Sequence, residues 1–219
     1  MVCRKTEIIA KEGWRYIAVF VVLFLFFTLS GCTLFALFFA FLAIFFAYIF
    51  RNPERVPDEF DEMSILAPID GKVSYIGKVF EKEHLKKEML KVSIDSSICD
   101  VSLQRNPFDM SIKKVLYTHG LSLDVKSDKS KTLNERVEIL SECEKGEVLI
   151  VSLVGKCSRK IHTICDNFKK VRKGDRYLLL TSGRVELFLP LECRIKVAEG
   201  EKVKAGESIL GYFLNDEQK

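Results

Sequence analysis

The sequence lacks the short motifs that mark several common functional classes. It contains neither a Gly-rich phosphate-binding loop nor a dinucleotide fingerprint. Its seven cysteines include no Cys-x-x-Cys pair. Scattered single cysteines are typical of small apolar side chains in a reducing compartment, so neither a disulfide framework nor a metal site is expected. Because the chain also lacks a run of like charges and any RNA- or DNA-binding motif, nucleic acid is not an expected partner.

Charge is absent from residues 17–50, which also hold most of the 17 phenylalanines of the chain. An apolar run above about 18 residues is typical of a membrane-embedded segment. Small and polar residues at 28–33 interrupt the run, and basic residues flank it on both sides. This pattern favours a helical hairpin with both ends on the cytoplasmic side of the inner membrane, and one tilted span is the alternative.

The remainder of the chain has the pattern of a β domain. Short apolar runs separated by Asp-Gly and other glycine turns begin near residue 65 and continue to residue 211. We therefore predict a membrane anchor at residues 1–50 and a soluble domain at 51–219. The predicted fold is mainly β (α+β), with barrel-like strands at the C-terminus and an N-terminal α-helical membrane hairpin.

Residues 178–190, LLLTSGRVELFLP, form the most informative stretch. Apolar residues alternate after the turn-prone pair Ser182-Gly183, as in a half-buried strand, and Pro190 ends the pattern. On local grounds alone, this is a strand that follows a plain hairpin turn or a bulge.

The same stretch resembles the self-processing segment of the phosphatidylserine decarboxylase family. In that family a Gly-Ser pair precedes an Arg-Val-Asp/Glu strand, and the chain cleaves itself before the serine, which becomes a pyruvoyl group. Arg184, Val185 and Glu186 match the strand, whereas the preceding pair stands in reverse order. Further resemblances occur in the family's order along the chain, at residues 50–55 (FRNPER), 68–73 (PIDGKV), 134–136 (NER) and 155–161 (GKCSRKI).

The resemblance implies roles for four residues. Ser182 would be the pyruvoyl precursor, with cleavage after Thr181, and Asp70 would help to activate it. Gly183 occupies the register of the family serine, and Ser111 stands where the family has a histidine for proton transfer. Restoring the family order at 182 and 183, together with a histidine at 111, is expected to increase cleavage. His84 and His162 match no family position.

The resemblance also implies pyruvoyl-dependent conversion of phosphatidylserine to phosphatidylethanolamine at a phospholipid membrane. Whether this chain is an active enzyme stays open, because the Gly-Ser order and the motif histidine are not kept. One alternative is an unprocessed homologue that binds phospholipid or a partner enzyme. Another is a membrane-anchored β domain without lipid chemistry. A homo-oligomer is also left open.

Overall fold

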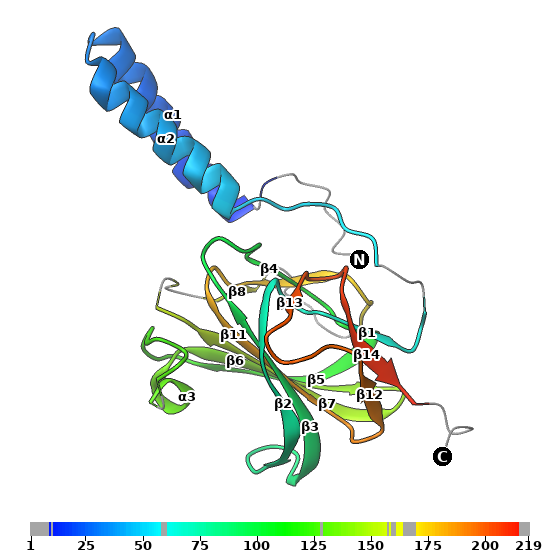
Figure 1. The fold of residues 1–219 in the computed structure, drawn as a ribbon. Helices are drawn as coiled ribbons and strands as arrows, with labels where there is room; N and C mark the ends of the chain where they lie inside the picture. The colour runs from blue at the N-terminus through cyan, green and yellow to red at the C-terminus, as the bar shows by residue number, and fades with distance from the viewer. Residues whose placement is uncertain are drawn as a thin grey trace. The chain divides into compact units, whose positions relative to one another are not determined.

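The structure is a computed structural model that describes residues 9, 11–57, 61–127, 129–156, 158, 161–163 and 170–214. The chain divides into two compact units, with the boundary between Glu54 and Arg55 (Figure 1). The first contains two helices, and the second contains the strands.

The helical unit is an antiparallel pair, α1 (Lys11–Leu29) and α2 (Thr33–Ile49). Between them Gly31 adopts a φ of 75°, the left-handed conformation that commonly ends a helix. Aromatic rings join the two helices, with centroids 5.0 Å apart for Phe20 and Phe46 and 5.3 Å apart for Phe27 and Phe35. The predicted turn at the small residues 28–33 is therefore confirmed.

The structure does not support the further prediction that this helical hairpin lies in a membrane. Among the described residues, neither helix combines the length and the apolar character needed to cross a bilayer. At a rise of about 1.5 Å per residue, α2 is about 26 Å long, which is shorter than a hydrocarbon core of about 30 Å.

An eight-stranded antiparallel sheet dominates the second unit and curls around its core (Figure 1). Its order is β13-β2-β3-β11-β7-β6-β5-β9. The bounds are β2 (Gly71–Glu81), β3 (Lys87–Ser96), β5 (Met110–Thr118), β6 (Arg136–Cys143), β7 (Gly146–Val154), β9 (Lys170–Val171), β11 (Gly183–Leu189) and β13 (Lys202–Val203).

Two three-stranded sheets complete the unit, with the orders β1-β14-β12 and β4-β10-β8. Their bounds are β1 (Ser64–Leu66), β14 (Ile209–Phe213), β12 (Cys193–Ile195), β4 (Leu103–Arg105), β10 (Arg176–Leu179) and β8 (His162–Thr163). A single helical turn, α3 (Ser130–Leu133), precedes β6.

The C-terminal strands are shared between two sheets. β13 pairs with β2, whereas β14 lies between β12 and β1. The mainly β class is thus confirmed, but these strands do not form a separate barrel-like module. Each has five residues or fewer and completes sheets begun earlier in the chain.

The core lies on one face of the large sheet. On β11, Val185, Leu187 and Leu189 are fully buried, as the alternation in the sequence predicts. The other face of β11 carries Arg184, Glu186 and Phe188. Ionisable groups on this face are therefore held outside the main core, close to the turn that precedes β11.

Candidate active site at the start of strand β11

The Ser182-Gly183 turn joins β10 to β11. Gly183 is the first residue of β11 and pairs with Ser96 of β3 and Val154 of β7. It is therefore enclosed on both sides by backbone. A Cβ atom at position 183 would lie 2.0 Å from the carbonyl oxygen of Leu153. A side chain at position 183 would therefore require the backbone of β7 to shift. The expectation that the family order at 182 and 183, together with a histidine at 111, increases cleavage stays a prediction.

Ser182 lies just outside the ladder and is half-buried. Its hydroxyl donates to the Ser96 carbonyl oxygen over a long 3.4 Å, and its own carbonyl oxygen accepts from the Gly155 N–H at 2.9 Å. A weak contact of this length leaves the hydroxyl free to rotate. Among the described residues, no group donates to the Thr181 carbonyl oxygen. For cleavage before Ser182, a nucleophile would attack the carbon of this same carbonyl group.

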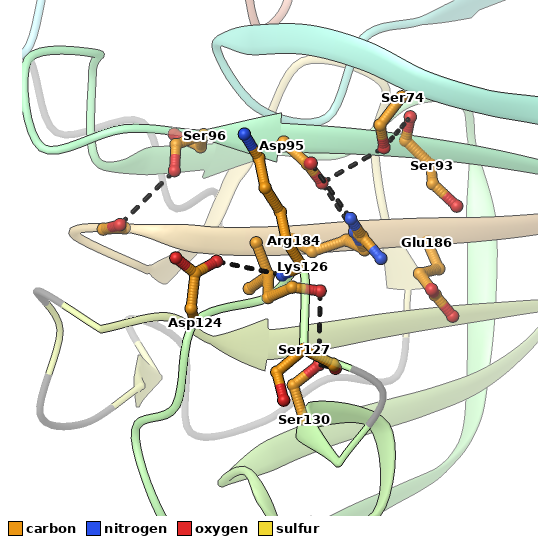
Figure 2. Close-up of polar contacts among 12 residues, drawn as sticks. Ser74, Ser93, Asp95, Ser96, Asp124, Lys126, Ser127, Ser130, Arg184 and Glu186 are labelled. Atoms are coloured by element: carbon orange, nitrogen blue, oxygen red, sulfur yellow. Dashed lines mark hydrogen bonds and ion pairs between the residues drawn. The ribbon is translucent and has the colours of Figure 1, made fainter.

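Arg184 is held by a bidentate ion pair beside this turn (Figure 2). Its Nε and Nη2 donate to the two carboxylate oxygens of Asp95 at 2.5 and 3.0 Å, and the hydroxyl of Ser74 donates to Asp95 Oδ1 at 3.1 Å. The hydrogen bonds to Asp95 are the main reason why the pKa of Arg184 is raised. The pair fastens β11 to β3 next to Ser182.

The loop before β6 reaches the same end of the sheet. The negative charge of Asp124 contributes to the raised pKa of Arg184, and the Lys126 N–H donates to Asp124 Oδ1 at 2.9 Å (Figure 2). The side-chain amide of Asn134 donates to the carbonyl oxygens of Val154 at 2.7 Å and Leu123 at 2.8 Å. Asn134 therefore fixes the loop against the end of β7, where Val154 faces Gly183. Residues 134–136, which resemble a family motif, thus lie close to the Ser182-Gly183 turn.

Asp70 lies at this end of the sheet but makes other contacts. Arg55 binds its carboxylate through both terminal nitrogens, with 2.7 Å from Nη2 to Oδ2, and the Ala205 N–H donates to Oδ1 at 2.7 Å. β3 separates Asp70 from β11, and two strand spacings amount to about 10 Å. Within the described part of the chain, no hydrogen bond joins Asp70 to Ser182 or Gly183, so its role in activation stays a prediction.

Ser111 lies at the other end of the strands. In register it pairs with Glu142 of β6, which faces Glu147 of β7, whereas Gly183 faces Val154. At about 3.3 Å per residue, the length of β7 between Glu147 and Val154 is on the order of 20 Å. The structure therefore does not bring Ser111 and Ser182 together.

Asp95 and Ser96 are the residues at this site that sequence reasoning missed. Both lie on β3, far from residue 182 in the sequence, and neither belongs to a quoted motif. The sequence feature that could have pointed to them is Arg184, the arginine of the Arg-Val-Glu strand. A half-buried arginine in such a position needs an acidic partner. The strand that supplies it follows from pairing, not from local pattern.

Comparison with known proteins shows the family of the chain. The family model described as phosphatidylserine decarboxylase matches residues 42–211. The phosphatidylserine decarboxylase proenzyme of Syntrophotalea carbinolica is 36% identical over 207 residues, covering 94% of this chain and 96% of the relative. The proenzyme of Geobacter metallireducens is 35% identical with the same coverage, and that of Syntrophus aciditrophicus is 37% identical over 78% of this chain and 80% of its own. The chain therefore belongs to the phosphatidylserine decarboxylase family.

Proposed function

We propose that this chain is a phosphatidylserine decarboxylase proenzyme whose pyruvoyl group derives from Ser182. The observation that carries the proposal is the position of Ser182 at the start of β11, between the Asp95–Arg184 ion pair and Gly155. Two of the family-like segments, at residues 134–136 and at Gly155, lie beside this turn. Family membership supplies the reaction, conversion of phosphatidylserine to phosphatidylethanolamine.

The turn can accommodate a pyruvoyl precursor at position 182 but not at 183. The Ser182 hydroxyl has a single weak partner among the described residues, whereas Gly183 has no side chain and is packed against the Leu153 carbonyl. A pyruvoyl group supplies the electron sink for loss of carbon dioxide from an amino acid headgroup.

The cleavage itself would use groups of this chain. The Ser182 hydroxyl would attack the Thr181 carbonyl carbon, forming an ester as the Thr181–Ser182 amide bond breaks. Elimination would then release a carboxylate on Thr181, and hydrolysis of the dehydrated Ser182 would release its nitrogen as ammonia. Asp70 is the candidate acceptor of the hydroxyl proton, by the family resemblance. The Asp95–Arg184 pair would hold β11 in place while the preceding bond is strained.

Intact mass spectrometry of the purified full chain tests this proposal. Cleavage before Ser182 gives fragments 1–181 and 182–219, the second beginning with pyruvoyl, and phosphatidylserine added in detergent should yield phosphatidylethanolamine. Ser182→Ala should give a single uncleaved chain. Processing is expected to be slow, because the hydrogen bond shown for the Ser182 hydroxyl goes to the Ser96 carbonyl oxygen and not to a general base. General acid-base help is typically worth about 10²- to 10⁴-fold.

A second function is favoured by two observations at the turn. The Thr181 carbonyl lacks a donor among the described residues, and the family serine register is filled by a tightly enclosed glycine. Both fit an unprocessed homologue that binds phospholipid or a partner enzyme at the membrane. A single intact chain that forms no phosphatidylethanolamine, yet binds phosphatidylserine vesicles, would establish this function instead.

We further propose that the helix pair places the protein at the cytoplasmic face of the inner membrane. Large apolar side chains along both helices support this, with Leu29 89% and Leu34 78% exposed at the turn. Burying such side chains in lipid is favourable by about 25 cal/mol per Å² of apolar surface. Self-association of the chain stays a prediction, which light scattering in detergent would test.

A further inference from the structure

A cavity of about 230 Å³ lies on the face of the large sheet that is opposite the main core. The loop between β2 and β3 forms one wall. Its floor includes Leu149, Val151 and Phe188, and its charged lining includes His84, Glu138 and Glu186. None of these charged residues takes part in the site around Ser182.

Three side chains in the cavity have the spacing of metal ligands. One ligand atom each from Glu83, His84 and Glu138 lies within 4.8 Å of the others. His84 Nε2 and Glu138 Oε2 are 3.2 Å apart. Ligands at 2.0–2.1 Å around a tetrahedral ion are about 3.3 Å from one another, so these two atoms already have the separation that a shared ion requires.

The loop that carries two of these ligands is held in place by Glu81. Its buried carboxylate accepts backbone N–H groups from Glu83 at 2.8 Å, His84 at 2.9 Å and Leu85 at 2.5 Å. Lys86 closes the loop with a φ of 51°. These contacts hold the backbone of the loop in place, which lowers the entropic cost of binding an ion, although the Glu83 side chain itself is 67% exposed.

Glu138 is oriented by a second contact. Arg136 Nε lies 3.1 Å from Glu138 Oε1, which leaves Oε2 directed toward His84. Arg136 Nη2 also lies 3.9 Å from Glu83 Oε2, so the guanidinium stands beside both proposed carboxylate ligands. Ligating carboxylates in proteins are commonly held by such neighbouring partners.

A separate observation points to a ligand in the same cavity. Glu186 is only 7% exposed, and its Oε2 is paired with Lys91 at 2.7 Å. Within the part of the chain that the structure describes, its Oε1 has no hydrogen-bond partner. A buried carboxylate oxygen without a partner is costly, and native structures usually satisfy it with water or an ion. Glu186 faces Val151, which in turn faces Glu138 across the sheet, so this oxygen lies on the same face as the cluster.

We propose that Glu83, His84 and Glu138 bind a divalent transition metal ion of the zinc class. One imidazole and two carboxylates suit such an ion, and three protein ligands leave a coordination position for water. Glu186 Oε1 is the acceptor that a metal-bound water in this cavity would reach. The site is separate from the Ser182 turn and does not depend on processing.

The test is a Zn²⁺ titration of the full-length protein in detergent, followed by calorimetry and by metal analysis after gel filtration. One equivalent should bind to the unaltered chain, and the thermal midpoint should rise by about 5 °C at a Zn²⁺ concentration 100-fold above Kd. His84→Gln and Glu138→Gln should each weaken this binding at least about tenfold.

His119→Gln provides the matched control, because His119 is an exposed histidine outside the cavity. It should bind Zn²⁺ as the unaltered chain does. If no stoichiometric Zn²⁺ binds, His84 and Glu138 form only an ion pair and the proposal is wrong. Binding that persists in both His84→Gln and Glu138→Gln would also overturn it, since the ion would then lie elsewhere, for example on the exposed thiols of Cys32 or Cys99.

Discussion

At the scale of single residues, Gly183 sets the tightest steric limit at the Ser182-Gly183 turn. A Cβ atom there would meet the Leu153 carbonyl oxygen, a backbone atom that cannot move aside without breaking the pairing of β11 with β7. We expect Gly183→Ser to lower the free energy of unfolding by about 1–3 kcal/mol, the usual cost of overpacking. Urea unfolding of the full chain measures this loss.

The neighbouring substitution Ser182→Ala is the control for this prediction. It removes one weak hydrogen bond from a half-buried side chain and should change stability by less than about 0.5 kcal/mol. Equal stability of Gly183→Ser and the unaltered protein would mean that the turn tolerates a side chain and that the close packing described here is wrong.

Asp70 is the second residue with a testable structural role. Its carboxylate, 7% exposed, receives both terminal nitrogens of Arg55 and the Ala205 N–H. Asp70→Asn leaves the Arg55 guanidinium without its main counter-charge, and breaking such a buried pair typically costs about 3–5 kcal/mol. Chemical denaturation should show this loss. Glu207→Gln, which removes a longer 3.9 Å contact to the same arginine, should have little effect.

Tyr117 makes the folding stability of the protein depend on pH in the alkaline range. Partial burial, together with a hydrogen bond to Glu135 and its negative charge, raises the pKa of Tyr117 to about 12. The folded state therefore holds this proton more tightly than the unfolded state, whose phenol has the ordinary value of about 10. The resulting stabilisation is complete below pH 10 and is lost as pH rises toward 12.

Thermal unfolding at pH 9 and pH 11 tests this prediction. The unaltered protein should lose more of its thermal midpoint over this interval than Tyr117→Phe, which has no phenolic proton to lose. Identical losses in the two proteins would show that the Tyr117–Glu135 contact does not persist in solution.

At the scale of elements, the loop between β2 and β3 depends on one carboxylate. Burial raises the pKa of Glu81, but hydrogen bonds from the backbone of Leu85, Glu83, His84 and Lys86 outweigh it, so the pKa is lowered below 4.5. A lowered pKa means that the stabilisation is present above the ordinary carboxyl value and is lost as pH falls through the folded value.

Glu81→Gln should therefore loosen this loop at neutral pH. Hydrogen bonds to a charged acceptor are worth about 1.5–3 kcal/mol, so amide exchange at residues 83–85 should become at least about tenfold faster. Glu88→Gln, on the adjacent strand β3, serves as a control. Unchanged exchange in Glu81→Gln would contradict the loop contacts described above.

At the scale of the whole molecule, the exposed apolar turn of the helix pair predicts binding to lipid. We expect the full chain to float with vesicles of phosphatidylserine and phosphatidylethanolamine in a density gradient. Leu29→Glu combined with Leu34→Glu should reduce the floating fraction at least about tenfold, because charged side chains are costly in the hydrocarbon region. Leu121→Glu changes an exposed leucine of the β unit and should leave flotation intact.

The sequence by itself determined the family, the helix pair, the mainly β class and the strand that follows Ser182-Gly183. Family motifs are short segments that can be read from the sequence alone, and so is a long run without charge. The alternation of Val185, Leu187 and Leu189 likewise reflects the geometry of a single strand. For the same reason, Ser182, Gly183 and Arg184 could be identified as a candidate turn without any structure.

Only the tertiary structure decided which distant groups meet. The enclosure of Gly183 between β3 and β7, the pairing of Arg184 with Asp95, and the distance between Ser111 and Ser182 all follow from strand register. His84 and Glu138 are 54 positions apart and match no motif, yet pairing through β7 and the β2–β3 loop brings them together. Local patterns encode the period of an element, whereas the choice of neighbours is set by packing over the whole core.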